Sequence, residues 1–332
     1  FIRVREIHFF EAHTCHVDEA DATRQIEEDL EIAARLMHDL CLPTLVARRP
    51  LWDTFPGAHY TVGIDVVMPD GRTLQVASVH HYRDQWARAF DVRYEDAQGE
   101  QQYCHQTTYG MSERLLGAVV GVHGDDRGLI LPPAIAPHQA VIVPVLAKEG
   151  ADDVLAACHE LQAQLREAGL RIHLDDRDLR PGQKYYDWEI RGVPLRLELG
   201  PRDLASGECV LAPRTGGKDS VPLAGATEAV KEALEAVAAE LRKRTEKANN
   251  ACMHVLPPLE RSAEGRLSLA EPVEPGRIYE IPFDGSDAEA AMVEELTGHS
   301  FLGDAREPFA KARKCAVSGK STKRRVWLAR SY

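Results

Sequence analysis

Arg114 stands immediately before an apolar segment, a setting that suggests a role in binding an anion. Residues 110–133 read GMSERLLGAVVGVHGDDRGLILPP, and the apolar residues that follow the arginine predict a buried helix beginning near Ser112. The free backbone N–H groups and the dipole at a helix start favour an anion, and the planar guanidinium adds a fixed charge suited to phosphate. A pairing of Arg114 with Glu113 or Asp125 is the alternative that these residues leave open.

The residues after this helix predict a tight turn and a short strand. Residues 123–128 have the composition of a turn, and residues 129–131 form an apolar run that Pro132 and Pro133 would stop. Arginine, buried helix, turn and Pro-Pro strand, in this order, resemble the third motif of class II aminoacyl-tRNA synthetases, in which the arginine contacts ATP.

The resemblance extends in both directions and narrows to the prolyl-tRNA synthetases. The matching segments are residues 1–14 (second strand of motif 2), 55–61 and 75–81 (amino-acid pocket), and 181–184, 188–194 and 199–204 (anticodon-binding domain). The order and spacing hold over nearly all 332 residues, and the C-terminal extension resembles the archaeal and eukaryotic-like type. Because the chain begins at Phe1, within a motif 2 strand, we expect an upstream portion that carries motif 1 and the first motif 2 arginine.

The resemblance implies ATP-dependent attachment of proline to tRNA(Pro) through prolyl-adenylate, with Mg²⁺. Since charge develops on phosphates, catalysis should rest on positioning and electrostatic stabilisation. Arg114 and Arg3, which matches the second motif 2 arginine, are the expected catalytic residues, although Arg3 could instead form a surface ion pair. These two arginines and Gln75 are the expected ATP-binding residues. The alternative is a noncatalytic synthetase-like protein that binds tRNA or has a regulatory role, because Ile7 replaces the family's adenine-stacking phenylalanine.

The proline pocket can be matched by position. The expected substrate-binding residues are Phe9, Glu11, His13, Phe55, Ser78 and His80. An apolar wall of Phe9 and Phe55 suits a pyrrolidine ring and argues against threonine or serine as substrate, while Glu11 can balance the secondary ammonium. Taken by themselves, Phe9, Glu11 and His13 at alternate positions are also typical of a half-buried strand.

The expected tRNA-binding residues lie in one segment of the anticodon-binding domain. Glu189 could accept hydrogen bonds from guanine, and Lys184 and Arg191 could contact base acceptors or phosphate. A surface pair between Glu189 and Arg191 is the alternative.

The C-terminal segment resembles the family's zinc-binding module, but its ligand pattern is broken. Asp284, Glu289 and Ser318 stand where cysteines are expected, and of the four only Cys315 remains. A structural zinc site needs a closed set of four suitable ligands. We therefore expect no zinc and no other metal site.

Composition bounds the remaining possibilities. A net charge of −12 counts against a nonspecific nucleic-acid binder, and the apolar runs fall short of the roughly 20 residues that a membrane span needs. The seven cysteines are scattered without a CxxC pair, which indicates a reducing, cytoplasmic environment. The resemblance to the family also implies that the protein forms a homodimer.

Hydrophobic periodicity and turn signals predict a mixed α/β protein. We expect an antiparallel-sheet class II catalytic core (1–136), an α/β anticodon-binding domain with a mostly parallel sheet (137–225), a helix and linker (226–276), and a small α+β C-terminal domain (277–332). The predicted helices cover residues 18–40, 153–168 and 227–248. The predicted strands cover 60–67, 73–79, 90–94, 141–145, 170–174, 195–199 and 208–212, with a hairpin turn at 69–71.

Overall fold

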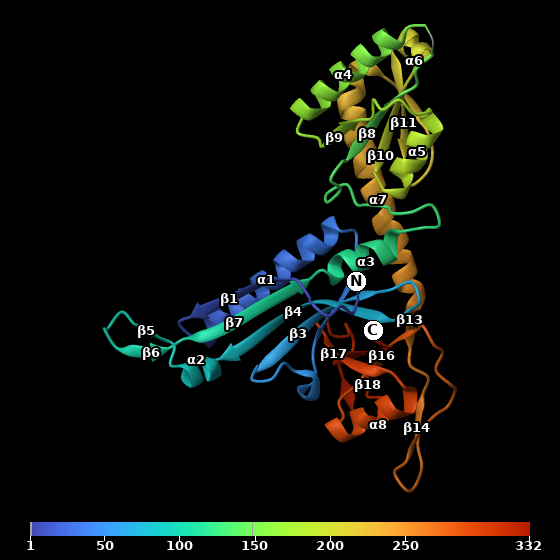
Figure 1. The fold of residues 1–332 in the computed structure, drawn as a ribbon. Coiled ribbons are helices and arrows are strands. Elements are labelled where there is room, and N and C mark those ends of the chain that lie inside the picture. The colour runs from blue at the N-terminus through green and yellow to red at the C-terminus, as the bar shows by residue number, and fades with distance from the viewer. Residues whose placement is uncertain (1, 148) are drawn as a thin grey trace. The chain divides into compact units, whose positions relative to one another are not determined.

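The computed structural model describes residues 2–147 and 149–332, so Phe1, the first residue of the expected motif 2 strand, lies outside the described residues. The chain divides into two compact units (Figure 1). One comprises residues 1–37, 43–118 and 247–332, and the other comprises 38–42 and 119–246. Each unit is described by itself.

The first unit is built on a nine-stranded sheet, antiparallel except at one end. Its order is β1 (Phe9–His16), β7 (His105–Ser112), β4 (Thr73–Arg83), β3 (Tyr60–Val67), β2 (Thr44–Arg48), β17 (Ser300–Ala305), β20 (Arg325–Ala329), β16 (Ile278–Pro282) and β13 (Met253–Val255). Only the pair of β13 and β16 is parallel. The predicted strands at 60–67 and 73–79 and the turn between them are confirmed, whereas residues 2–8, expected within a strand, form no regular element.

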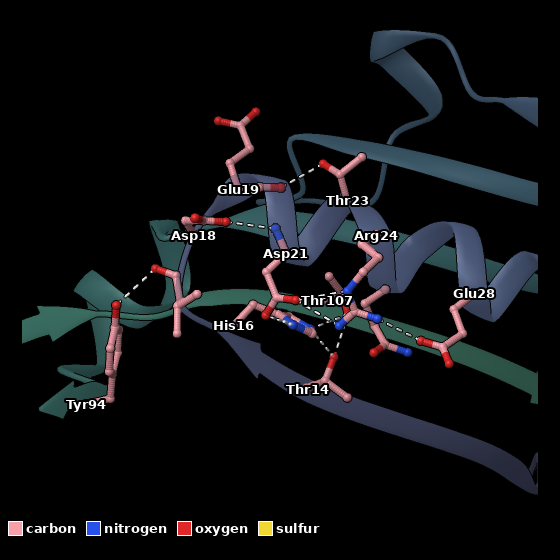
Figure 2. A network of polar contacts seen from close by, with 12 residues as sticks. Thr14, His16, Asp18, Glu19, Asp21, Thr23, Arg24, Glu28, Tyr94 and Thr107 are labelled. Carbon is pink, nitrogen blue, oxygen red and sulfur yellow. Dashed lines mark hydrogen bonds and ion pairs between the residues drawn. The ribbon is translucent and has the colours of Figure 1, made fainter. Parts of the chain in front are cut away.

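Helix α1 (Glu19–Asp39) confirms the predicted amphipathic helix. Its buried apolar residues recur every three or four positions, as expected for a helix with one face against a sheet: Ala22, Ile26, Leu30, Ala33 and Met37. Polar contacts at its first turns hold β1 and β7 in place (Figure 2): His16 bonds Asp21 at 3.1 Å and Thr14 at 2.8 Å, and Thr14 bonds Thr107. Because side chains alternate along β1, its odd-numbered residues, Phe9, Glu11 and His13 among them, face the side opposite to Thr14 and His16.

The strand predicted at residues 90–94 is confirmed only in its second half. Phe90 is the last residue of a short helix, α2 (Gln85–Phe90), which ends at Asp91 in the left-handed conformation, and the strand β5 (Arg93–Glu95) begins at Arg93. This strand forms a hairpin with β6 (Gln101–Tyr103). Trp86 stacks on Tyr82, with ring centroids 4.5 Å apart, and so holds α2 against the end of β4.

Helix α3 (Arg114–His123) confirms the predicted apolar helix, but the prediction that it is completely buried is wrong. Ala118 and Val119 are buried, whereas Leu116 and Val120 are 54% and 43% exposed. One face of the helix packs on the core, and the described residues do not cover the other. Residues 129–131 do not form the expected strand, although the N–H of Leu129 donates to the carbonyl of Ile190 at 3.0 Å.

The second unit contains a five-stranded sheet. Its order is β12 (Asp219–Pro222), β11 (Glu208–Pro213), β10 (Leu195–Leu199), β8 (Ala140–Pro144) and β9 (Ile172–Leu174). The pairs β10–β8 and β8–β9 are parallel, and the other two are antiparallel, so the sheet is mixed where a mostly parallel one was expected. The helices are α4 (Ala151–Glu167), α5 (Pro181–Ile190), α6 (Pro201–Ser206) and the long α7 (Ala226–Cys252), of which α4 and α7 match predicted helices.

The C-terminal segment is part of the first unit. It adds α8 (Asp287–Thr297), the small hairpin of β18 (Arg313–Lys314) and β19 (Ser321–Thr322), and three strands of the large sheet. Residues 256–275, expected to be a linker, include the hairpin of β14 (Leu259–Arg261) and β15 (Leu267–Leu269), which packs on the same core. The expected separate domain at 277–332 therefore shares a sheet with the catalytic core. None of the helices in the described parts is both long and apolar enough to cross a membrane.

Candidate active site

A cavity of about 390 Å³ lies over the middle of β1, β7 and β4. The strand register places Glu11 opposite Gly110, and Gly110 opposite Ser78, so three neighbouring strands contribute one row to its floor. Gly110 has no side chain, which leaves the space between the other two open; a Cβ there would lie 3.7 Å from the Phe9 ring and 4.0 Å from Glu11. The structure thus brings five predicted substrate-binding residues to one cavity: Phe9, Glu11, Phe55, Ser78 and His80.

A chain of hydrogen bonds sets the polarity of this cavity. Phe55 donates its backbone N–H to Thr61 Oγ1 at 3.0 Å, and Thr61 Oγ1 lies 2.9 Å from Nδ1 of His80. Nε2 of His80 lies 3.0 Å from Ser78 Oγ, so the neutral ring donates to one of these two hydroxyls and accepts from the other. Burial lowers the pKa of His80 to about 4, against the opposing charge of Glu11, so the ring is neutral at physiological pH.

His13 is not brought into the cavity wall. Its side chain is 60% exposed, its Nδ1 lies 2.9 Å from Thr108 Oγ1, and its Nε2 lies 3.4 Å from a carboxylate oxygen of Glu11. The predicted substrate residue therefore stands behind Glu11, where it can orient that carboxylate.

A second cavity of about 400 Å³ contains the expected nucleotide residues Arg114 and Gln75. Arg114 is half-buried and donates from Nε to the carbonyl of Ile2 at 3.1 Å. Neither alternative partner holds it, because Glu113 accepts from the backbone of His8 and Asp125 pairs with Arg214. The terminal residue Tyr332 also lines this cavity.

Arg3 lines neither cavity. It is exposed, in the irregular segment before β1, and no hydrogen bond or ion pair to it occurs in residues 2–147 and 149–332. The surface ion pair considered for it is therefore not formed in this structure, and its role as a phosphate contact stays a prediction.

Three residues line both cavities and so form their shared wall: Arg49, Asp53 and Gln75. Arg49 is buried and pairs with Asp65, which is 1% exposed, at 2.7 Å. Sequence reasoning missed Arg49, Asp53 and Asp65, and it included Thr61 in the matched pocket segment 55–61 without giving it a role. A signal was present, because Asp65 interrupts the apolar strand β3, and a charged residue inside such a strand is seldom buried without a partner.

In the second unit, the structure contradicts the tRNA-binding prediction for Lys184. This residue is 1% exposed, and its ammonium donates to the carbonyl of Asp175 at 2.9 Å. It lies on the face of α5 that packs on the sheet, so it holds the loop after β9 and cannot reach a base.

Glu189 and Arg191 do not pair with each other. Glu189 bonds Arg127 at 3.0 Å, and the Arg191 guanidinium stacks on the Trp188 ring at 5.0 Å. Glu189 lines a cavity of about 190 Å³ with four cations in its wall, each paired with a carboxylate of Asp125, Glu189 or Glu198: Arg127, Arg196, Arg214 and Lys218. A carboxylate among cations in a concave site can accept from a guanine edge while the cations meet phosphate or base acceptors.

At the expected zinc positions, Cys315 and Glu289 make hydrogen bonds and ion pairs with neighbouring protein groups. Burial raises the pKa of the Cys315 thiol, but hydrogen bonds from the Ser318 side chain and from neighbouring backbone N–H groups outweigh it and lower the pKa overall. Glu289 caps α8 through Ser286 and pairs with Arg261 at 2.7 Å. Within the described ranges, no three His, Cys, Asp or Glu side chains come close enough to hold a metal.

Two protein families match consecutive parts of the chain. The class II tRNA synthetase core domain family (G, H, P, S and T) matches residues 1–123, and the anticodon binding domain family matches residues 139–233. Proline–tRNA ligases from Thermococcus kodakarensis and Methanosarcina mazei are 45% and 43% identical to the whole chain, which covers 69% and 68% of their lengths. The prolyl-tRNA synthetase of Giardia lamblia, solved in complex with prolyl-adenylate, superposes with a TM-score of 0.88 at 32% identity, over all of this chain and 70% of that one. The chain therefore belongs to the proline–tRNA ligase family of class II aminoacyl-tRNA synthetases.

Proposed function

We propose that this chain forms prolyl-adenylate from proline and ATP and transfers the prolyl group to tRNA(Pro). The observation that carries the proposal is the adjacency of two cavities with one shared wall, one that joins two phenylalanine rings to polar side chains such as Glu11 and one with a half-buried arginine. Adenylate formation needs this arrangement, because the proline carboxylate must meet the α-phosphate of ATP. It favours a catalyst over a noncatalytic tRNA-binding protein.

In the first cavity, proline binds with its ring against Phe9 and Phe55. The secondary ammonium lies against the Glu11 carboxylate, and the neutral His80 holds the Ser78 hydroxyl in place beside it. A protonated His80 would repel the ammonium, so its low pKa favours substrate binding. The rings of Phe9 and Phe55 supply apolar contact area for the pyrrolidine ring.

In the second cavity, ATP binds with its phosphates near Arg114 and its adenosine near Gln75. Arg114 is charged at all relevant pH values and can stabilise the phosphate charge that develops in the transition state. Mg²⁺ enters with ATP as part of the substrate, and the carboxylates of Asp53 and Glu294 at this cavity are the hard oxygen donors that it prefers.

The second unit binds the tRNA anticodon through the basic cavity around Glu189. Support comes from its composition and from the match of residues 139–233 to the anticodon-binding family. Arg191 borders this surface through its stacking on Trp188. A homodimer, a cytoplasmic location and the domain boundaries 1–136, 137–225, 226–276 and 277–332 stay proposals that rest on the family resemblance.

The proposed activity is tested by proline-dependent exchange of pyrophosphate into ATP in the full-length protein. Glu11→Gln should raise the KM for proline by at least tenfold and leave the KM for ATP within threefold, because Glu11 contacts only the amino acid. Glu100→Gln, in the exposed β5–β6 hairpin, is the matched control and should behave as the parent. Absence of exchange in the parent would reject the proposed reaction, and an equal rise in both KM values would remove Glu11 from the proline site.

A further inference from the structure

Lysine is distributed unevenly along this chain. Residues 1–147 contain none, and four of the ten lysines fall within residues 311–323: Lys311, Lys314, Lys320 and Lys323. Residues 308–332 carry eight basic residues and no acidic one, in a chain whose net charge is −12. We call residues 308–325 the basic hairpin, because they are built around β18 and β19 (Figure 1). The charge of this segment is therefore opposite to that of the chain as a whole.

The arginines of the basic hairpin pair with carboxylates of the large sheet. Arg313 and Arg325 lie 3.4 and 2.6 Å from Glu280, in β16. Arg324 pairs with Asp304, in β17. These contacts fix the hairpin to two strands of the first unit, and they leave the arginine charges largely matched by protein groups.

The four lysines of the basic hairpin are exposed and have no such partner. Within residues 2–147 and 149–332, none of their ammonium groups makes an ion pair or a hydrogen bond, whereas Lys184, Lys218 and Lys231 each donate to a protein oxygen. Glu307, the one acidic residue between positions 306 and 332, does not pair with them either. Their positive charge is therefore available to an anionic partner.

Hydrogen bonds hold the turn between β18 and β19 in shape. The N–H of Cys315 donates to the carbonyl of Lys320 at 2.7 Å. The buried sulfur of Cys315 accepts from the backbone N–H groups of Asp284 at 3.1 Å and Ser318 at 3.4 Å. The backbone positions of Lys314 and Lys320 are thus fixed on either side of the turn, while their side chains extend into solvent.

The place of the basic hairpin in the fold relates it to the active site. It connects β17 to β20, which are neighbouring strands of the large sheet. Leu302, in β17, lines the cavity that contains Arg114. Lys311 follows Leu302 by nine positions, and a segment of that length spans at most about 30 Å. A polyanion that contacts the hairpin can therefore extend to this cavity.

We propose that the basic hairpin is a second RNA-binding surface, which contacts phosphates of the acceptor arm of tRNA(Pro). The inference rests on the proposed function, because the acceptor end must reach the catalytic unit to receive the prolyl group. Helical RNA is recognised mainly by its shape and by contacts to phosphate and 2′-hydroxyl groups. Exposed lysines suit phosphates, since they are mobile point charges that release counterions on binding.

The surface of the basic hairpin favours RNA over a lipid membrane. Proteins that bind at a membrane surface usually insert exposed apolar side chains beside their basic residues. All of residues 308–325 are described, and none of them is an exposed large apolar residue: Phe309 and Val317 are buried. The hairpin therefore offers charge without an apolar anchor.

The test removes the four lysine charges together in the full-length protein. All four lysines are replaced by glutamine in one variant and by arginine in a second, which keeps the charge. The matched control replaces four exposed arginines of the same unit by glutamine: Arg24, Arg88, Arg93 and Arg261. It changes the net charge by the same amount, but each of these arginines already pairs with a protein carboxylate.

Binding is measured by fluorescence anisotropy with two RNAs, a minihelix of the acceptor arm and the anticodon stem-loop. In the glutamine variant, the minihelix should bind about tenfold or more weakly, and the slope of log Kd against log salt should fall by roughly 3 to 4, because each phosphate contact contributes about 0.9. Binding of the anticodon stem-loop should stay within twofold of the parent. The arginine variant and the control should bind both RNAs within threefold.

Aminoacylation supplies a second readout. The KM for tRNA should rise in the glutamine variant in proportion to the loss of minihelix binding, while tRNA-independent exchange of pyrophosphate stays within twofold. Exchange also reports that the catalytic unit of the variant is folded.

Three results would overturn the proposal. One is a glutamine variant that binds the minihelix within twofold of the parent with the same salt slope. Another is an equal loss of binding in the arginine control, which would show an effect of net charge alone. The third is lost binding to phosphatidylserine vesicles with unchanged RNA binding, which would assign the hairpin to a membrane. A parent without exchange would reject the proposed function, whereas an active parent with any of these results would reject only the role of the hairpin.

Discussion

His80 should remain neutral well below the pH at which an ordinary histidine titrates. The ring is 9% exposed and lies between Thr61 and Ser78, with the Phe55 ring 4.9 Å away. Burial lowers its pKa from 6.5 to about 4. In the unfolded chain the same ring recovers its ordinary value, so between these two values the unfolded state binds more protons than the folded state.

The sign and size of the effect follow from this difference. Folding stability rises with pH wherever the unfolded state holds more protons, so the first unit should lose stability as the pH falls from about 7 towards 4. The full difference of two to three pKa units corresponds to about 3 kcal/mol, and at pH 5 the loss relative to pH 8 should be about 2 kcal/mol. His59 and His81 also have pKa values lowered by burial and add to the same trend.

The comparison that isolates His80 is between the parent and His80→Gln. Ring NMR of the parent, with the variant used for assignment, should give one histidine titrating near pH 4. Urea unfolding followed by a probe in the first unit should show about 2 kcal/mol less pH dependence between pH 8 and 5 in the variant. His254→Gln, an exposed histidine of the same unit, serves as the control for loss of a ring. A His80 resonance that titrates between pH 6 and 7 would refute the assigned burial and the neutral state of the ring.

Three further results are expected. Arg114→Ala should reduce proline-dependent pyrophosphate exchange by about 10²-fold, as expected for loss of one donor to the transition state, and near-normal exchange would remove it from the ATP site. Glu189→Ala should raise the KM for tRNA in aminoacylation and leave tRNA-independent exchange unchanged, because the residue lies in the second unit; loss of both would contradict an anticodon role. The purified protein should contain no stoichiometric zinc, and circular dichroism should show the C-terminal segment folded in the presence of a chelator, because Cys315 lacks the other ligands of a closed site; one zinc per chain with loss of structure on chelation would contradict this.

Elements with a local cause could be predicted from the sequence. The spacing of Ile26, Leu30 and Met37 is enough to predict α1, and the Pro-Asp-Gly turn between apolar runs is enough to predict the hairpin of β3 and β4. Alternation along β1 likewise places Glu11 on the face of its strand away from α1. Prediction was less accurate at α2, a short helix that was not expected and whose Trp86 stacks on Tyr82, so that the strand expected from residue 90 begins only at Arg93.

The pocket residues could be proposed from motif positions, but the sequence could not show that they lie next to one another in the folded chain. Glu11 and Ser78 are 67 positions apart in the sequence and meet only because β1, β7 and β4 pair in one particular register. A shift of one residue in any pair would turn a side chain to the other face of the sheet. No local pattern encodes that register.

By itself, the sequence determined the residue types that reach the sites and the helices and strands that carry them, because periodicity and turn chemistry act over a few residues. Only the tertiary structure decided which charged groups are free and which are structural. The Lys184 ammonium donates to a backbone carbonyl inside the second unit. Nothing in the sequence singles out Arg49, which bonds Asp65 and Leu302 from distant strands and keeps one donor, Nε, without a partner in the described structure. The physical reason is that desolvation and hydrogen-bond partners depend on which segments pack together, and these partners lie up to 253 residues apart along the chain.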